Sequence, residues 1–134
     1  LAGWVLVRKE PRLGAGRADF LLERAGEELL VEVKSVTWVE DGVALFPDAP
    51  TARGRRHLAE LAQAVKDGTR AALVFVVQRP DAVAFGPSPI DPAFAEGFRE
   101  ALSAGVGTFA LVCSFDGERL HLERFLGPEA LTFP

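Results

Sequence analysis

A run of seven apolar residues, "AALVFVV" at 71–77, constrains the fold of this chain more than any other feature. A strand that is apolar at every position is typical of a sheet covered on both faces, as parallel sheets are. The run follows an amphipathic helical pattern at 51–66, for which Thr51 is a suitable amino-terminal cap and Gly68 a suitable stop. Together with an upstream strand, these segments predict a right-handed β-α-β crossover.

The rest of the chain alternates strand, turn and helix signals. Strands are predicted at residues 4–9, 18–24 and 28–36, which form an antiparallel arrangement with a hairpin near the amino terminus. A Pro-rich loop is predicted at 79–90, a second helix from its cap at Asp91 to Ala104, and a carboxyl-terminal hairpin at 108–124 with an Asp116–Gly117 turn. The pattern therefore predicts an α/β domain in which helices pack on a mixed sheet.

Composition limits the class of protein. With 134 residues, of which 49% are hydrophobic, residues 1–134 are predicted to form one domain. No apolar run is long enough to span a bilayer, and the single cysteine, Cys113, has no partner for an internal disulfide. We therefore expect a soluble cytoplasmic protein without a membrane partner. The chain begins at Leu1 and has no methionine, which indicates a fragment of a longer protein.

Charged residues in the strand at 28–36 require an explanation. Glu32 and Lys34 share one face of this strand, because successive side chains alternate. If Ala25 and Gly26 form a two-residue turn, Asp19 lies directly opposite Glu32. Two opposed carboxylates repel each other unless a cation lies between them. Lys34 supplies one positive charge, and a divalent metal would supply more.

Oxygen ligands on two strands suit Mg²⁺ or Mn²⁺ better than zinc. The predicted metal ligands are Asp19, Glu32 and the backbone carbonyl of Val33, with Lys34 beside the attacking water. Such a site is suited to phosphodiester hydrolysis. The alternative is that Glu32 and Lys34 form ordinary ion pairs on a solvated sheet face. An odd-length turn would also move Asp19 to the other face of the sheet.

The segments "RADFLLE" and "VEVKSVTWVEDGVALFPDAPTARGRRHLAEL" resemble the carboxyl-terminal domain of the sugar fermentation stimulation protein family. The resemblance implies a PD-(D/E)XK, restriction-endonuclease-like core in a family described as DNA-binding and linked to bacterial sugar metabolism. Its acid and E-x-K signature falls on Asp19, Glu32 and Lys34. The family also has an amino-terminal oligonucleotide-binding-type barrel, so the chain is interpreted as a fragment that lacks this domain.

Further residues are candidates for the same site. His57 is predicted to act in catalysis, and four arginines are predicted to bind substrate phosphate: Arg17, Arg53, Arg55 and Arg56. Glu10 resembles a family acidic position that can support a metal. Each has a structural alternative. Arg17 can pair with acids at the hairpin end, His57 can be a hydrogen-bonded core residue, and the helix arginines can be solvated charges.

The sequence thus predicts a DNA-binding protein with an Mg²⁺- or Mn²⁺-dependent nuclease site, a metal-dependent hydrolase of phosphodiester bonds. The alternative is a non-catalytic DNA-binding transcriptional regulator of sugar metabolism. A third class, an oligomerisation or small-ligand domain, gives no reason for two carboxylates to lie opposite each other. The net charge of −4 means that any nucleic-acid contact is a local basic patch. The expected partner is DNA, with RNA as an alternative, and a homodimer is one option for assembly.

Overall fold

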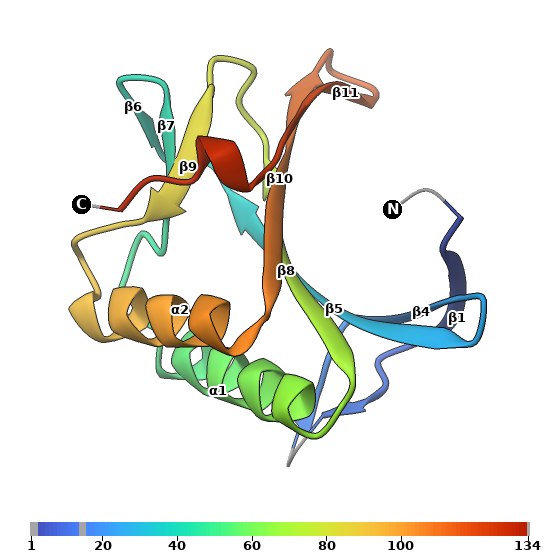
Figure 1. Cartoon of the computed structure of the whole chain (residues 1–134). Coiled ribbons are helices and arrows are strands. Elements are labelled where there is room, and N and C mark those ends of the chain that lie inside the picture. Colours follow the sequence, from blue (N-terminus) through green and yellow to red (C-terminus); the bar gives the residue numbers. More distant parts are fainter. Residues whose placement is uncertain (1–2, 14–15, 134) are drawn as a thin grey trace.

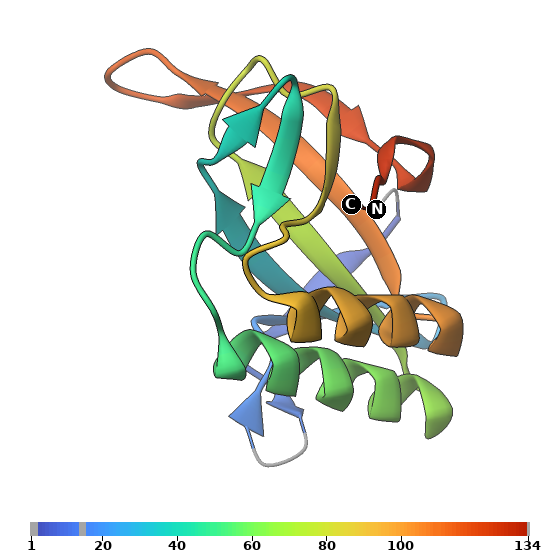
Figure 2. The same cartoon turned by 90° about the vertical axis from the view of Figure 1, so that its left-hand side faces the viewer.

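A six-stranded mixed sheet with two helices on one face forms the body of the protein (Figures 1 and 2). The computed structural model describes residues 3–13 and 16–133. Its strands are β1 (Val5–Lys9), β2 (Arg12–Leu13), β3 (Gly16–Arg17), β4 (Phe20–Arg24), β5 (Glu27–Val36), β6 (Val39–Glu40), β7 (Val43–Phe46), β8 (Arg70–Val77), β9 (Ala84–Pro87), β10 (Gly107–Phe115) and β11 (Leu120–Leu126). The helices are α1 (Ala52–Lys66) and α2 (Pro92–Ala104), and a short 3-10 helix spans Pro128–Ala130. The main sheet has the order β1-β4-β5-β8-β10-β11.

The predicted hairpin is present, and its register is the one on which the site depends. β4 and β5 are antiparallel, with Arg24 opposite Glu27 and Phe20 opposite Val31. The two loop residues, Ala25 and Gly26, have φ angles of 49° and 83°. Positive φ at both positions gives the twist that a two-residue hairpin loop needs. The even length of this loop keeps the register that was predicted from the sequence.

The centre of the sheet is parallel, as the apolar run at 71–77 predicted. β5 and β8 are parallel neighbours with α1 between them in the chain, and β8 and β10 are parallel neighbours with α2 between them. The two helices lie side by side on the same face of the sheet and run in the same direction (Figure 2). Their amino-terminal ends therefore meet at the same end of the molecule.

Both helices begin and end near the predicted residues. The Thr51 hydroxyl accepts a hydrogen bond from the Gly54 N–H at 2.9 Å, and Gly105 ends α2 with a φ of 108°. A Cβ at Gly54 would lie 3.3 Å from the Phe94 ring and 2.8 Å from the Thr51 methyl group. Gly54 therefore allows close contact between the two helices.

Thr51→Ala is expected to lower the free energy of unfolding by about 1 kcal/mol, because an N–H in the first turn of α1 loses its side-chain acceptor. Urea denaturation followed by circular dichroism measures this change. Thr51→Ser keeps the hydroxyl and is the matched control. Equal losses in both variants would show that the methyl group, rather than the cap, is what matters.

The sheet separates two apolar clusters. The larger lies between the sheet and the helices and includes Leu73, Phe75, Leu61 and Phe98, each at most 2% exposed. The smaller lies on the other face of the sheet and contains buried residues of β5 and β8: Leu29, Val31, Ala72 and Val74. Strand alternation explains this division. β8 contributes to both clusters, which accounts for its uninterrupted apolar sequence.

Two sequence predictions need correction. The segment 79–90, predicted to be a loop, contains β9, which pairs in parallel with β7 in a second sheet of order β6-β7-β9. Its prolines lie outside the strand or at its last residue, where a missing N–H is tolerated. The hairpin turn was predicted at Asp116–Gly117, but Asp116 N–H donates to the Arg119 carbonyl, so the turn centres on Gly117 and Glu118.

Among the described residues, neither helix combines the length and the apolar character needed to cross a bilayer. The longer one, α1, has 15 residues and carries charged side chains along its exposed side.

Candidate active site

The carboxyl groups of Asp19 and Glu32 meet at the start of the β4–β5 hairpin. Asp19 directly precedes β4, and the hairpin register places it opposite Glu32 in β5. The two side chains lie close enough for Asp19 to raise the pKa of Glu32. Two carboxylates that lie close together repel each other unless a cation or a proton lies between them.

Backbone hydrogen bonds fix Asp19 from three directions. Its N–H donates to the Val31 carbonyl at 3.1 Å, its carbonyl accepts from the Glu10 N–H at 2.8 Å, and its Oδ2 accepts from the Val33 N–H at 2.7 Å. In a strand, the N–H and C=O groups of one residue point to the same edge. The Val33 carbonyl therefore points to the edge of β5 that Asp19 occupies.

Glu32 is buried on the helix-covered face of the sheet, where it is 2% exposed. Burial, together with the neighbouring Asp19, raises its pKa to about 8, while the positive charge of Lys34 opposes the change. Its Oε2 lies 2.5 Å from Nδ1 of His57, so the imidazole ring is in direct contact with this buried carboxyl group. A buried carboxyl group is costly unless another group binds it.

Lys34 and His57 lie beside the acid pair and complete a cluster of four ionisable residues: Asp19, Glu32, Lys34 and His57. Lys34 Nζ lies 3.2 Å from Nδ1 of His57, which comes from the second turn of α1 and is 4% exposed. Burial lowers the pKa of His57, and the nearby positive charges of Lys34 and Arg53 lower it further. Burial also lowers the pKa of Lys34, although Glu32 and Asp19 oppose this. The lowered pKa favours the uncharged form of the His57 ring.

The oxygen atoms of this cluster fit a hard divalent cation. Asp19 supplies a carboxyl group, Glu32 supplies a buried one, and Val33 presents a carbonyl at the same edge of β5. Residues 3–13 and 16–133 contain no group of three or more His, Cys, Asp or Glu side chains arranged to hold a metal. Further ligands would have to be water or substrate oxygens, which Mg²⁺ commonly keeps.

A polar cavity of about 390 Å³ opens beside the acid pair. The side chains that line it come from the loop before β4 and from the first turns of α1: Glu10, Arg17, Asp19, Arg53, Arg56 and His57. Arg17 Nη1 donates to the Glu10 carbonyl at 3.1 Å, and Arg56 Nε lies 3.5 Å from Glu60 Oε1. Three guanidinium groups around one small cavity form a local positive patch on an acidic protein.

Of the four arginines predicted to bind substrate, Arg55 is the one that does not line this cavity. Its guanidinium Nη1 lies 2.8 Å from Asp91 Oδ2, at the amino-terminal end of α2. Arg55 points to another side of the helix than Arg53 and Arg56, since successive helical residues are about 100° apart. The sequence identified Asp91 as a helix cap but gave no sign that it also contacts α1.

Comparison with known proteins identifies the family of this chain. Residues 1–119 match the model of the "Sugar fermentation stimulation protein RE domain". A sugar fermentation stimulation protein homolog of Desulforamulus reducens is 43% identical over 90% of this chain and 51% of that protein. The sugar fermentation stimulation protein homolog of Moorella thermoacetica is 51% identical over 85% of this chain and 50% of the Moorella protein. The chain thus spans about half the length of the curated relatives it matches.

A solved structure agrees with the sequence comparisons. SfsA of Pyrococcus furiosus, determined in complex with Ca²⁺, is 36% identical and superposes with a TM-score of 0.92. The match covers 99% of this chain and 57% of the Pyrococcus chain. The match to the family model covers most of the chain, and the fold and the resemblance seen in the sequence agree with it. This chain belongs to the sugar fermentation stimulation protein family.

Proposed function

We propose that this chain is a nuclease domain of the PD-(D/E)XK type, which binds DNA and hydrolyses phosphodiester bonds with Mg²⁺ or Mn²⁺. The observation that carries the proposal is the proximity of the Asp19 and Glu32 carboxyl groups, with Lys34 on the same face of β5 as Glu32. Two acids and an amine grouped on a mixed sheet are the groups that this chemistry requires.

Each residue of the cluster has a distinct role in the proposed reaction. Asp19, Glu32 and the Val33 carbonyl would hold the cation, which when bound stabilises negative charge that develops on the phosphate and lowers the pKa of nearby water. Lys34 donates a hydrogen bond to the attacking water and orients it. The His57 ring contacts the Lys34 ammonium group and helps to fix it in this position.

The arginines of the cavity would bind the substrate backbone. Arg17, Arg53 and Arg56 surround the space next to the acid pair, at a place where phosphate would approach the cation. Guanidinium groups bind phosphate oxygens with two parallel hydrogen bonds. These contacts carry no base information, so they support binding of nucleic acid without sequence preference.

The bound cation of a relative supports the oxygen site. Pyrococcus furiosus SfsA was determined in complex with Ca²⁺. Ca²⁺ and Mg²⁺ both prefer carboxylate, carbonyl and water oxygens, although Mg²⁺ requires a more regular octahedron. The donors at Asp19, Glu32 and Val33 are of this type. Because this chain spans about half of its relatives, the proposal concerns this domain and not the complete protein.

A second candidate is a DNA-binding regulatory domain that does not cleave DNA. The observation that favours it is the pKa of Glu32, which burial raises to about 8. A carboxyl group that keeps its proton near neutral pH is a weak ligand, because a cation must displace that proton. Such a domain would keep the basic cavity and bind DNA without turnover.

One assay separates the two candidates. The protein is incubated with plasmid DNA, single-stranded DNA and RNA in Mg²⁺, Mn²⁺ or EDTA, beside a Glu32→Gln variant. Cleavage of a substrate that requires both the metal and Glu32 supports the nuclease. Retardation of DNA without cleavage, equal in metal and in EDTA, would refute the nuclease and support the regulator.

Arg53→Ala is expected to weaken DNA binding about tenfold and to reduce the slope of log affinity against log salt by about one, because one phosphate contact is lost. Fluorescence anisotropy at several salt concentrations measures both quantities. Lys66→Ala removes the same charge at the opposite end of α1 and is the control. If both variants lowered affinity equally, the effect would be one of net charge and not of the cavity.

A further inference from the structure

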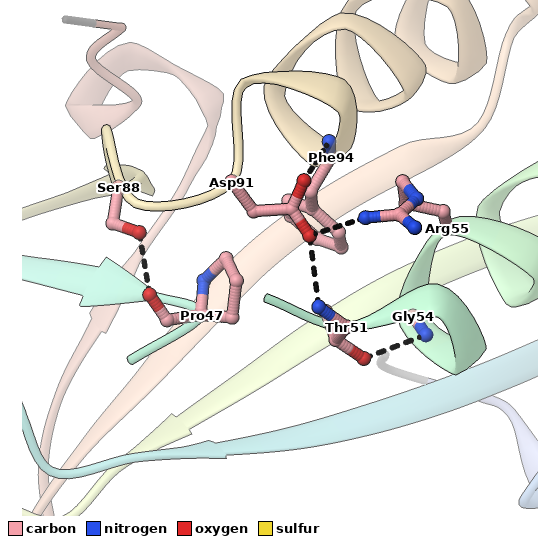
Figure 3. A network of polar contacts seen from close by, with 7 residues as sticks. All are labelled: Pro47, Thr51, Gly54, Arg55, Ser88, Asp91 and Phe94. Atoms are coloured by element: carbon pink, nitrogen blue, oxygen red, sulfur yellow. Dashed lines mark hydrogen bonds and ion pairs between the residues drawn. The ribbon is translucent and has the colours of Figure 1, made fainter. Parts of the chain in front are cut away.

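The carboxylate of Asp91 joins the amino-terminal ends of both helices (Figure 3). Asp91 is the N-cap of α2, where its Oδ1 accepts from the Phe94 N–H at 3.0 Å. Its Oδ2 accepts from the Thr51 N–H and from Arg55 Nη1, each at 2.8 Å. Thr51 is itself the N-cap of α1. One side chain thus caps α2 and holds α1 by its first turn.

The contact between Asp91 and the start of α1 is buried, which strengthens its hydrogen bonds. Asp91 is 3% exposed, and the backbone N–H of Thr51 is the largest cause that lowers its pKa. Charge-assisted hydrogen bonds are short and strong, and a buried carboxylate that lost them would be left without compensation. The same two chain segments meet again nearby, where the Ser88 hydroxyl donates to the Pro47 carbonyl (Figure 3).

The first turns of α1 connect this contact to the candidate active site. Arg53 and His57 lie within six residues of Thr51 on a continuous helix, which moves as one rigid element. His57 Nδ1 lies 2.5 Å from Glu32 Oε2 and 3.2 Å from Lys34 Nζ. A shift of α1 by a fraction of an ångström would therefore change both distances.

We propose that Asp91 is a positioning residue. It holds α1 in the position, relative to the sheet, in which His57 and Arg53 face the Glu32–Lys34 pair. Arg55, which does not line the basic cavity, serves this purpose through its ion pair with Asp91. The effect on cleavage rests on the proposed nuclease function. The effect on the placement of His57 does not.

Asp91→Asn tests the positioning role directly. Asparagine has a single side-chain oxygen, so it can keep the cap of α2 but cannot also accept from Thr51 and Arg55. The ring nitrogen signals of His57 are recorded by ¹⁵N–¹H NMR at one pH, and we expect them to shift. His121 pairs with Asp116 in the exposed carboxyl-terminal hairpin, so its signals are the internal control and should stay in place.

Two further variants keep the test independent of folding. Arg55→Ala leaves both helix caps intact and is expected to shift the His57 signals in the same direction by a smaller amount. Thr108→Val removes a buried hydrogen bond to the Leu73 carbonyl without touching α1, so it controls for a general loss of stability. If the His57 signals of Asp91→Asn and Arg55→Ala matched those of the wild type, the proposal would be wrong.

Kinetics separate this inference from the proposed function. In a cleaving enzyme, Asp91→Asn is expected to lower kcat roughly tenfold to 100-fold through misplacement of α1 residues. The concentration of Mg²⁺ for half-maximal rate should stay the same, because the acid pair lies on the sheet. Shifted His57 signals in a protein that cleaves nothing would refute the nuclease and leave the positioning role standing. A decrease in Mg²⁺ affinity as large as the decrease in kcat would overturn the positioning role.

Discussion

Asp19→Asn is expected to lower the rate of Mg²⁺-dependent DNA cleavage at least about 1000-fold. The substitution removes the negative charge that would hold the cation, and a loss of about 4 kcal/mol of transition-state stabilisation corresponds to this factor. Asparagine keeps an oxygen that can accept from the Val33 N–H, so the sheet edge is retained. Single-turnover cleavage of a labelled duplex measures the rate.

Asp41→Asn is the matched control for this experiment. Asp41 is exposed in the turn between β6 and β7 and has a φ of 51°, a conformation that asparagine tolerates well. This variant has the same change in charge and should cleave at the wild-type rate. DNA affinity of Asp19→Asn, measured in EDTA, should remain close to that of the wild type. Cleavage by Asp19→Asn at the wild-type rate would remove the acid pair from the mechanism.

The metal-free protein is expected to lose several kcal/mol of unfolding free energy between about pH 5 and pH 8. The pKa of Glu32 is about 8 in the folded protein and 4.5 as an ordinary side chain, so the folded state keeps a proton that the unfolded state releases. The stabilisation is complete below the lower pKa and is lost as the pH rises to the higher one. Each pKa unit corresponds to about 1.4 kcal/mol. Urea unfolding in EDTA across this range measures the change.

Glu32→Gln isolates this effect, because glutamine does not titrate. His57 acts in the opposite direction, since its lowered pKa favours folding as the pH rises, so only the comparison of the two proteins is informative. We expect the variant to be the more stable protein at pH 8 in EDTA. Added Mg²⁺ should stabilise the wild type at pH 8 by binding the ionised carboxylate. Parallel pH profiles of the two proteins would show that Glu32 is ionised throughout.

The acid pair could be predicted because it depends on local rules. The even turn at Ala25 and Gly26 fixes the register, and strand alternation then determines which side chains share a face with Glu32. Both rules act over fewer than twenty residues. The helix caps at Thr51 and Asp91 follow from equally local preferences.

Other features depend on contacts between distant segments. β9 was missed because a short strand among prolines resembles a loop, and its partner, β7, lies 41 residues away in the chain. The partner of Arg55 could not be predicted either, because helical spacing shows which way a side chain points but not which element it meets. Burial of Glu32 beneath α1 is likewise a tertiary effect, and it determines the pKa of the site.

The hydrogen bond from the Val33 amide to Asp19 makes one proton of the main chain a reporter for the whole site. β4 begins at Phe20 and does not pair with β5 at Val33. The Asp19 carboxylate therefore accepts the hydrogen bond that a backbone carbonyl of a neighbouring strand would normally accept. Any event that draws the Asp19 oxygens away from β5 must release this amide to solvent. Its hydrogen-exchange rate therefore records how tightly the carboxylate is engaged, without any substrate or enzymatic turnover.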